Sequence, residues 1–300
     1  MWIYTEVDGL EELAEEEDIA IEEKTREHFK KARKIVVKAG SNVVTTEDDL
    51  NIRIMNCIAR ELSDLAQGRY SNGEKVHVVY VSSGALKAGM HHYSLTDKPE
   101  DIAEQQALCS IGQGILFQQY SSLFYGWDQD VGQILVEREH MSDIGLKTTI
   151  ETGWNVVYSR NVIPIFNYND PVDKRELLAE SKGGGNDELA ARIAFLINAD
   201  LLILLTDTDG LHTENPKVNP NAPLVSRVEE MTSEVANWAS GSNQEHESKG
   251  GMRYKLAARN HFKGDIVIAN GAPKQNGVYS VIHDIFSGKI IGTYLMREAK

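Results

Sequence analysis

Two glycine-rich segments, each at the start of a predicted helix, carry residue types that bind phosphate groups. They are "GGGND" (183–187) and "KGGMRYK" (249–255). Glycines at a helix start let backbone N–H groups approach an anion closely, and the helix dipole favours negative charge there. With two lysines and several carboxamides nearby in the pattern, these segments suit a polyanion bound beside a second substrate.

Polar segments also follow the apolar runs that we interpret as strands. They are "KAGSN" (38–42), "SSGA" (82–85), "NYND" (167–170) and "TDTDG" (206–210). Ligands of open α/β sheets bind beyond the carboxyl ends of the strands. Each segment alone has a structural explanation, as a turn or a solvated lysine. Their common placement after strands favours a functional site.

The elements that would position these residues alternate along the chain. Several short apolar runs are continuous, as expected of strands that are covered on both faces. Segments with helical spacing separate them, as in "NDELAARIAFLINAD" (186–200). The pattern predicts a doubly wound α/β sheet between layers of helices. The predicted strands are 34–40, 75–85, 131–137, 161–167, 200–207, 264–271 and 289–296.

Composition narrows the class of protein. The net charge of −14 argues against a general nucleic-acid binder, although a local site can still be positive. No apolar run approaches the roughly 20 residues of a membrane span. Cys57 and Cys109 have no metal-ligand spacing and favour a reducing compartment, so we expect no metal site on the protein and a cytoplasmic location.

The N-terminal segment has an unusual charge order. Residues 6–23 carry ten acids and no base, whereas residues 24–34 carry six bases and one acid. Acids early and bases late match a helix dipole. We expect a solvated helix that precedes the core; the alternative is an arm that binds a partner.

The motifs, in their order along the chain, resemble the amino-acid kinase superfamily and, within it, the glutamate 5-kinase family. The similarity covers residues 33–299. It rests on the motifs "VVKAGSNVV", "VSSGALKAG", "SIGQG", "VGQILVE", "VIPIFNYND", "GGGNDELAA", "LLILLTDTDGLHTENP" and "GGMRYKLAA".

The resemblance implies a three-layer α/β/α sandwich with a mostly parallel central sheet. It also implies transfer of the ATP γ-phosphate to the side-chain carboxylate of glutamate, the first step towards proline. Mg²⁺ would be held chiefly through the phosphates, because it takes few protein ligands of its own. Catalysis would consist mainly of positioning and electrostatics.

Three residues are implied to be catalytic by the same matching. Lys38 would contact the phosphoryl group from the acceptor side, Lys255 would contact the nucleotide phosphates, and Asp187 would orient both lysines. The residues implied to bind the amino acid are Ser83, Gly84, Asp170 and Asn186. Those implied to bind ATP are Lys38, Gly40, Thr206, Asp207, Gly250, Gly251, Met252 and Lys255.

Finer roles follow from the chemistry of the amino acid. Asp170 suits the α-ammonium, whereas the hydroxyl of Ser83 and the amide of Asn186 suit the α-carboxylate. The N–H groups of Gly40, Gly250 and Gly251 would reach the phosphates.

Three positions depart from the family's usual pattern. Asn42 stands where the family has Thr or Ser, Gly185 where it commonly has Asp, and Ala190 where it often has Ser. Gly185 keeps open a sister kinase with a different carboxylate or phosphate acceptor. A regulatory protein that binds nucleotide or amino acid without turnover is the other alternative.

The expected organisation is a helical N-terminal extension, residues 1–33, followed by a kinase domain, residues 34–300. Its N-terminal half would bind the acceptor and its C-terminal half the nucleotide. We expect no PUA domain. The resemblance further implies a dimer or tetramer, and feedback inhibition by proline is a reasonable expectation.

Overall fold

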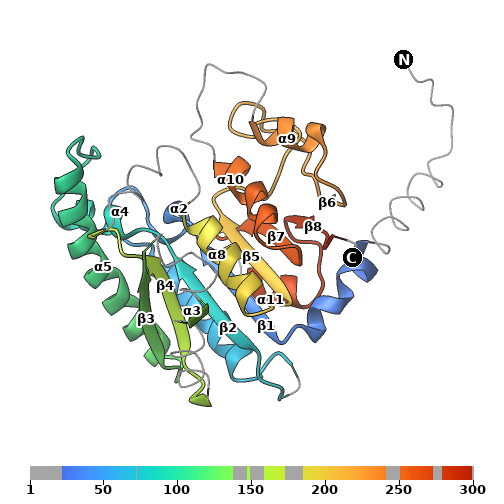
Figure 1. The fold of residues 1–300 in the computed structure, drawn as a ribbon, viewed down its shortest axis with the longest axis horizontal. Coiled ribbons are helices and arrows are strands. Elements are labelled where there is room, and N and C mark those ends of the chain that lie inside the picture. The colour runs from blue at the N-terminus through green and yellow to red at the C-terminus, as the bar shows by residue number, and fades with distance from the viewer. Residues whose placement is uncertain are drawn as a thin grey trace.

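An eight-stranded sheet forms the centre of the protein (Figure 1). The computed structural model describes residues 22–71, 73–137, 147–148, 159–172, 185–240, 251–272 and 279–298. Across the sheet the strands follow the order β3 (Val131–Val136), β4 (Ile163–Tyr168), β2 (His77–Ser82), β1 (Lys34–Ala39), β5 (Leu201–Thr206), β7 (Asp265–Asn270), β8 (Thr293–Leu295) and β6 (Arg227–Val228). β8 runs antiparallel to β7, and the other neighbouring strands are parallel. The sequence predicted all of these strands except the two-residue β6.

The central strands are apolar throughout because both of their faces are covered. In β1, Ile35 and Val37 pack into one hydrophobic cluster, while Val36 packs into a second cluster on the opposite face. In β5, Ile203 and Leu204 divide in the same way. Successive side chains of a strand point to opposite faces, so a strand buried on both sides shows no polar alternation.

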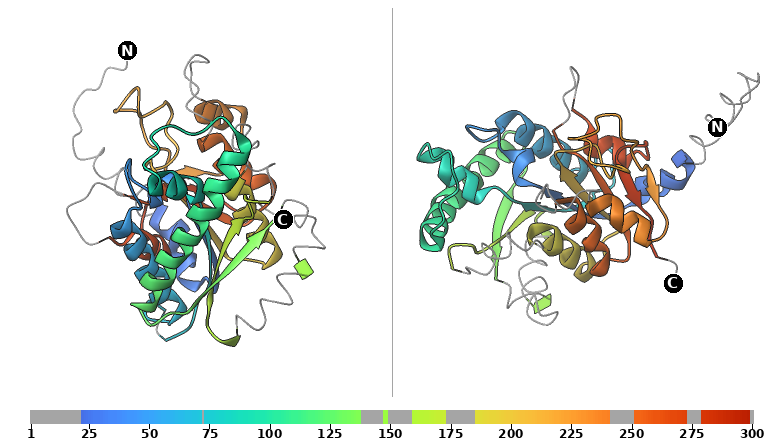
Figure 2. Two further views of the ribbon diagram at one scale, coloured as in Figure 1. Left: turned by 90° about the vertical axis from the view of Figure 1, so that its left-hand side faces the viewer. Right: turned by 90° about the horizontal axis from the view of Figure 1, so that it is seen from above.

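Helices cover both faces of the sheet, which confirms the predicted three-layer α/β/α architecture (Figure 2). α3 and α11 pack on one face and α8 and α10 on the other. Within the described residues, no helix combines the length and the apolar character needed to cross a membrane. The helices are η1 (Glu27–Lys31), α2 (Ser41–Val44), α3 (Ile52–Ala66), α4 (Ala85–His92), α5 (Ile102–Tyr125), α8 (Gly185–Leu196), α9 (Ser233–Ser240), α10 (Gly251–Ala257), η3 (Ala258–Asn260) and α11 (Val281–Phe286).

Glycines let α4 and α5 pack with their backbones in contact. A Cβ atom on Gly112 would lie 1.9 Å from the carbonyl oxygen of Ala85, and one on Gly89 would lie 2.1 Å from that of Leu108. No side chain fits at such distances. Gly89 is therefore a helix-packing residue, not the turn residue that is its simplest explanation from sequence. The structure explains the first glycine after "SI" in the "SIGQG" motif. Gly112 lets α5 approach α4 closely, and this places its neighbour Gln113 against the sheet.

The described end of the N-terminal segment packs into the fold. Residues 22–26 are α-helical and lead into η1. Glu22, Arg26 and Phe29 are buried, and Arg26 is completely inaccessible. Its guanidinium pairs with Glu22 at 2.8 Å and donates to the carbonyl oxygens of Ile291 and Ser226. The expectation of a solvated helix is therefore wrong for this part of the segment, because one arginine satisfies carbonyl groups from two distant loops.

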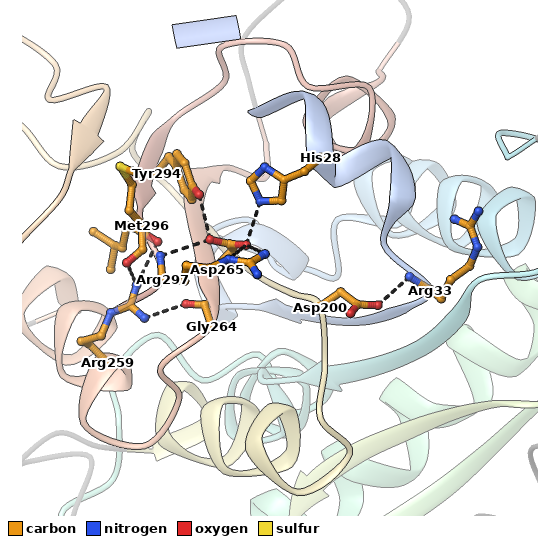
Figure 3. A network of polar contacts seen from close by, with 10 residues as sticks. His28, Arg33, Asp200, Arg259, Gly264, Asp265, Tyr294, Met296 and Arg297 are labelled. Atoms are coloured by element: carbon orange, nitrogen blue, oxygen red, sulfur yellow. Dashed lines mark hydrogen bonds and ion pairs between the residues drawn. The ribbon is translucent and has the colours of Figure 1, made fainter. Parts of the chain in front are cut away.

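Asp265, at the start of β7, ties the same segment to the C-terminal strand (Figure 3). Its buried carboxylate accepts from the Tyr294 hydroxyl at 2.7 Å and the Arg297 backbone N–H at 3.1 Å, and it contacts His28 Nε2 at 2.8 Å. Burial would raise the pKa of Asp265, but hydrogen bonds from Arg297, Tyr294 and His28 hold that pKa below its usual value. These contacts join residues before β1 to residues after β8.

Replacing Arg26 with Ala should lower the free energy of unfolding by about 3–5 kcal/mol, because Glu22 is then left buried without its main partner. Lys263→Ala is the matched control. Its ion pair with Glu298 is exposed on both sides, and it should cost no more than about 1 kcal/mol. Urea unfolding of both variants measures the difference. Equal losses would mean that the N-terminal segment is not part of the cooperative core.

Candidate active site

One buried carboxylate holds two lysines at the carboxyl ends of the strands. Asp187, in the first turn of α8, lies 2.8 Å from the ammonium nitrogen of Lys38 in β1 and 2.9 Å from that of Lys255 in α10. All three residues are buried. The sequence predicted these three residues as a unit, and the structure brings them together. Two ammonium groups share one carboxylate, so the cluster carries a net positive charge that suits a polyanion.

The electrostatics keep Asp187 ionised. Burial alone would raise the pKa of Asp187, but the charges and hydrogen bonds of Lys255 and Lys38 outweigh it and lower the pKa to about 2. The carboxylate is therefore a constant counter-charge at physiological pH and not a proton acceptor.

The residues predicted to bind the nucleotide lie at the end of β5 and at the start of α10. Thr206 ends β5 and is buried, and Asp207 follows it at an exposed position. Gly251 opens α10, and no described atom lies within 4 Å of where its Cβ would be. Met252 is partly buried against the hydrophobic cluster beneath α8 and α10. Gly250, predicted beside them, lies outside the described residues.

Gly40 does not offer the backbone donor that the sequence predicted. Its N–H group donates to the carbonyl oxygen of Leu205 at 3.2 Å. This bond attaches the loop after β1 to the end of β5. Gly40 therefore joins the ends of β1 and β5. A phosphate could accept from its N–H only if the hydrogen bond to Leu205 broke.

Asn42 connects the two halves of the site. Its Nδ2 donates to Asp207 at 3.1 Å, and its Oδ1 accepts from the Lys87 ammonium at 2.8 Å. Lys217 lies 3.4 Å from the same Asp207 carboxylate. Although burial acts to raise it, the pKa of Asp207 is lowered by Asn42 and Lys217. An amide provides a donor and an acceptor together, which explains how Asn42 serves where the family has a hydroxyl residue.

The predicted acceptor-side residues also converge. Ser83 follows β2, and its hydroxyl oxygen accepts from Asn186 Nδ2 at 2.9 Å. Gly84 has a φ of 109°, in the left-handed region that favours glycine, and it begins α4. Asp170 follows β4 at the same edge of the sheet.

Two further residues at this edge were not predicted as site residues. Asn167, the penultimate residue of β4, accepts from Asn186 Nδ2 at 2.9 Å, and Gln113 of α5 accepts from Asn167 at 2.6 Å. Asn167 could have been found from the sequence, because it is a polar residue within an otherwise apolar strand. The signal for Gln113 is only the glycine on either side of it.

Comparison with known proteins agrees with this architecture. Residues 33–262 match the amino acid kinase family. The chain belongs to that family. Among its relatives are glutamate 5-kinases from Clostridium tetani, 35% identical over 90% of this chain and 96% of that protein, and from Clostridium acetobutylicum, 37% identical over 86% and 94%. The resemblance seen in the motifs is therefore confirmed.

Solved structures of other kinases show the same fold at low identity. Isopentenyl phosphate kinase from T. acidophilum has a TM-score of 0.55 and 16% identity, covering 87% of this chain and 99% of that chain. UMP kinase from Ureaplasma parvum has a TM-score of 0.56 and 13% identity, covering 88% and 99%. At such identity the likeness extends to the sheet and its helices only.

Asp187→Asn should lower the free energy of unfolding at pH 7 by about 3 kcal/mol or more, because two buried ammonium groups lose their counter-charge. The lowered pKa of Asp187 contributes about 2 kcal/mol, present above about pH 4 and lost as the pH falls towards 2. The gap between wild type and variant should therefore narrow in acid.

Urea unfolding from pH 7 down to pH 3 tests this, with Asp97→Asn at an exposed position as the control. The control should stay within about 0.5 kcal/mol of the wild type. A gap for Asp187→Asn that is independent of pH would contradict the charge argument.

Proposed function

We propose that this protein transfers the γ-phosphoryl group of ATP to the side-chain carboxylate of glutamate, forming glutamyl 5-phosphate. The observation that carries the proposal is the buried cluster of Lys38, Asp187 and Lys255 between the strand ends. Relatives named glutamate 5-kinase, aligned over most of both chains, support the choice of acceptor. In a proline-synthesising cell this reaction would be the first step towards proline.

The chemistry requires positioning and charge, and it requires no base. The attacking carboxylate of glutamate is already ionised, so no proton has to be removed from the nucleophile. Charge is spread over the phosphoryl oxygens in the transition state, where fixed cations stabilise it. Lys38, from the β1 side, would contact the phosphoryl group beside the acceptor. Lys255 would contact the nucleotide phosphates, with Asp187 holding both ammonium groups in place.

Binding of the two substrates would divide along the sheet. The ends of β2 and β4 would hold glutamate, and the end of β5 with the start of α10 would hold ATP. The glutamate residues are Ser83, Gly84, Asp170 and Asn186. The ATP residues are Lys38, Thr206, Asp207, Gly250, Gly251, Met252 and Lys255, whereas Gly40 joins the ends of β1 and β5 and does not donate its N–H to the phosphates.

Mg²⁺ fits this site only when it arrives with the nucleotide. The described residues contain no cluster of three potential metal-ligating side chains, and both oxygens of Asp187 face lysines. When bound, the ion would neutralise charge on the β- and γ-phosphates. An oligomeric state and proline inhibition stay predictions from the resemblance, and a cytoplasmic location stays a prediction from the sequence.

Trapping of the acyl phosphate with hydroxylamine tests the function directly. The purified protein, ATP, Mg²⁺ and glutamate should give glutamyl hydroxamate. Gly185, beside Asn186, is the observation that favours a different acceptor in the same family, so aspartate and N-acetylglutamate belong in the same assay. UMP, whose product UDP forms no hydroxamate, is tested beside them by the formation of ADP. Turnover with one of these and none with glutamate would transfer the proposal to that acceptor.

Lys38→Ala and Lys255→Ala should each reduce kcat by about 100- to 1,000-fold, the usual effect of removing one preorganised charge donor. Arg should not rescue either position, because a planar fork replaces a compact point charge in a buried space. Steady-state rates of ADP formation measure the effect. Lys289→Ala, at an exposed lysine that pairs with Asp284, is the control and should leave kcat unchanged. Near-normal turnover of either active-site variant would contradict the assignment.

Asp170→Ala should act on the amino acid and not on the nucleotide. Loss of a charge-assisted hydrogen bond costs about 1.5–3 kcal/mol, so KM for glutamate should rise by about tenfold or more. KM for ATP should stay within about twofold. The opposite pattern, weakened ATP with unchanged glutamate, would move the end of β4 to the nucleotide half.

A further inference from the structure

A bridge of side chains crosses the active edge of the sheet at the end of β1. Lys87, in the first turn of α4, donates to Asn42 Oδ1 at 2.8 Å, and Asn42 Nδ2 donates to Asp207 at 3.1 Å. An ammonium group can only donate and a carboxylate can only accept, so these two neighbours fix the orientation of the Asn42 amide. Because β1 lies between β2 and β5 in the sheet, the bridge joins the helix that follows β2 to the segment that follows β5.

Lys87 differs in its partner from the two buried lysines of this edge. Lys38 and Lys255 both pair with the carboxylate of Asp187, whereas the half-buried Lys87 is held by a neutral amide. Among the described residues, no carboxylate forms an ion pair with Lys87. An ammonium group has three N–H donors, and Asn42 occupies one of them. Lys87 therefore keeps both its positive charge and donors for a ligand.

The position of the bridge indicates which ligand Lys87 would meet. Asn42 lies in α2, two residues after Gly40, and the ammonium nitrogen of Lys38 lies 3.6 Å from where a Cβ of Gly40 would be. The bridge therefore starts in the loop that borders Lys38. One end of it lies on α4, which begins beside the residues proposed to hold glutamate, and the other end is Asp207, proposed to bind ATP. The group that lies between acceptor and nucleotide during the reaction is the transferred phosphoryl group.

We propose that Lys87 is a further cation of the active site, that its ammonium group binds the terminal phosphate of ATP, and that Asn42 is the residue that positions it. The inference rests on the proposed function for the identity of the acceptor, whereas binding of the terminal phosphate can be measured without an acceptor. During transfer the bond between the γ-phosphorus and the oxygen shared with the β-phosphate breaks, a carboxylate oxygen of glutamate bonds to phosphorus, and ADP leaves. Lys87 transfers no proton, and its charge stabilises the phosphoryl oxygens.

The amide of Asn42 suits this role better than the hydroxyl group that the resemblance leads one to expect. A carboxamide carries its donor and its acceptor on two separate atoms, whereas a hydroxyl group must donate and accept through one oxygen. Asn42 can therefore contact Asp207 and Lys87 at once. Because the amide is neutral, it leaves the charge of Lys87 for the ligand.

Nucleotide binding in the absence of an acceptor tests the contact with the terminal phosphate. Lys87→Ala should raise the Kd for the β,γ-imido analogue of ATP by about tenfold, and the Kd for ADP by less than about twofold, because only the analogue carries the terminal phosphate. Calorimetric titration of the purified protein in the presence of Mg²⁺ measures both values. Equal losses for the two nucleotides, or no loss for either, would overturn the proposal.

Lys75→Ala is the matched control for that titration. Lys75 is exposed just before β2, at the opposite edge of the sheet from Lys87. Its replacement removes the same charge from the protein, and both Kd values should stay within about twofold of wild type. A loss for the ATP analogue that is as large in Lys75→Ala as in Lys87→Ala would mean that net charge, and not a contact of Lys87, determines binding.

Asn42 is tested in two backgrounds. Asn42→Ala should reduce the preference for the ATP analogue over ADP by about threefold or more in the otherwise wild-type protein, and by less than about 1.5-fold when residue 87 is already alanine. The effect of Asn42 should disappear in the second background because it acts through Lys87. A loss of the same size in both backgrounds would remove the positioning role of Asn42.

Turnover separates the terminal phosphate from the acceptor carboxylate as the partner of Lys87. In Lys87→Ala, kcat should fall by about tenfold or more, while KM for glutamate should stay within about twofold. A raised KM for glutamate with unchanged nucleotide Kd values would place Lys87 on the acceptor and overturn the proposal. If the wild-type protein does not turn over glutamate, the proposed function fails, whereas the two nucleotide Kd values still decide the role of Lys87.

Discussion

The position of one buried carboxylate between two lysines constrains the whole active edge of this protein. Asp187 can hold Lys38 and Lys255 together only if β1, α8 and α10 meet at one end of the sheet. Two ammonium groups in an apolar interior need a counter-charge, and a single carboxylate leaves the cluster positive. The ion pairs with Asp187 lower the free-energy cost of burying the two lysines. The same ion pairs hold the ammonium groups in position for an anionic ligand.

The acceptor side solves a different problem, which is how to keep neutral polar groups beneath a sheet. Asn167 and Gln113 are buried because each amide is satisfied by the next, and the chain ends on backbone groups of fixed polarity. Close packing of α4 on α5 makes this feasible, since Gly112 brings Gln113 within reach of β4. A bulkier residue there would separate the helices and break the chain of amides.

The fold of this protein and the chemistry of its candidate site depend on different sets of residues. Solved structures with 13–16% identity have the same fold, so quite different sequences support this scaffold. The residues that follow the strands are what differ in chemistry, and function depends on them. Asn42 illustrates this point: an amide in the loop after β1 joins Lys87, after β2, to Asp207, after β5.

The sequence by itself determined the layers and seven of the eight strands, and its resemblance to a known family implied the cluster around Asp187. Continuous apolar runs report burial on both faces, and glycines with charged residues after them mark the ends where ligands bind. It could not show that Arg26 is buried or that Gln113 belongs to the acceptor side. Those features depend on which groups meet across the fold: periodicity reports how deeply a side chain lies, whereas the direction of a hydrogen bond is decided by partners that only tertiary packing brings within 3 Å.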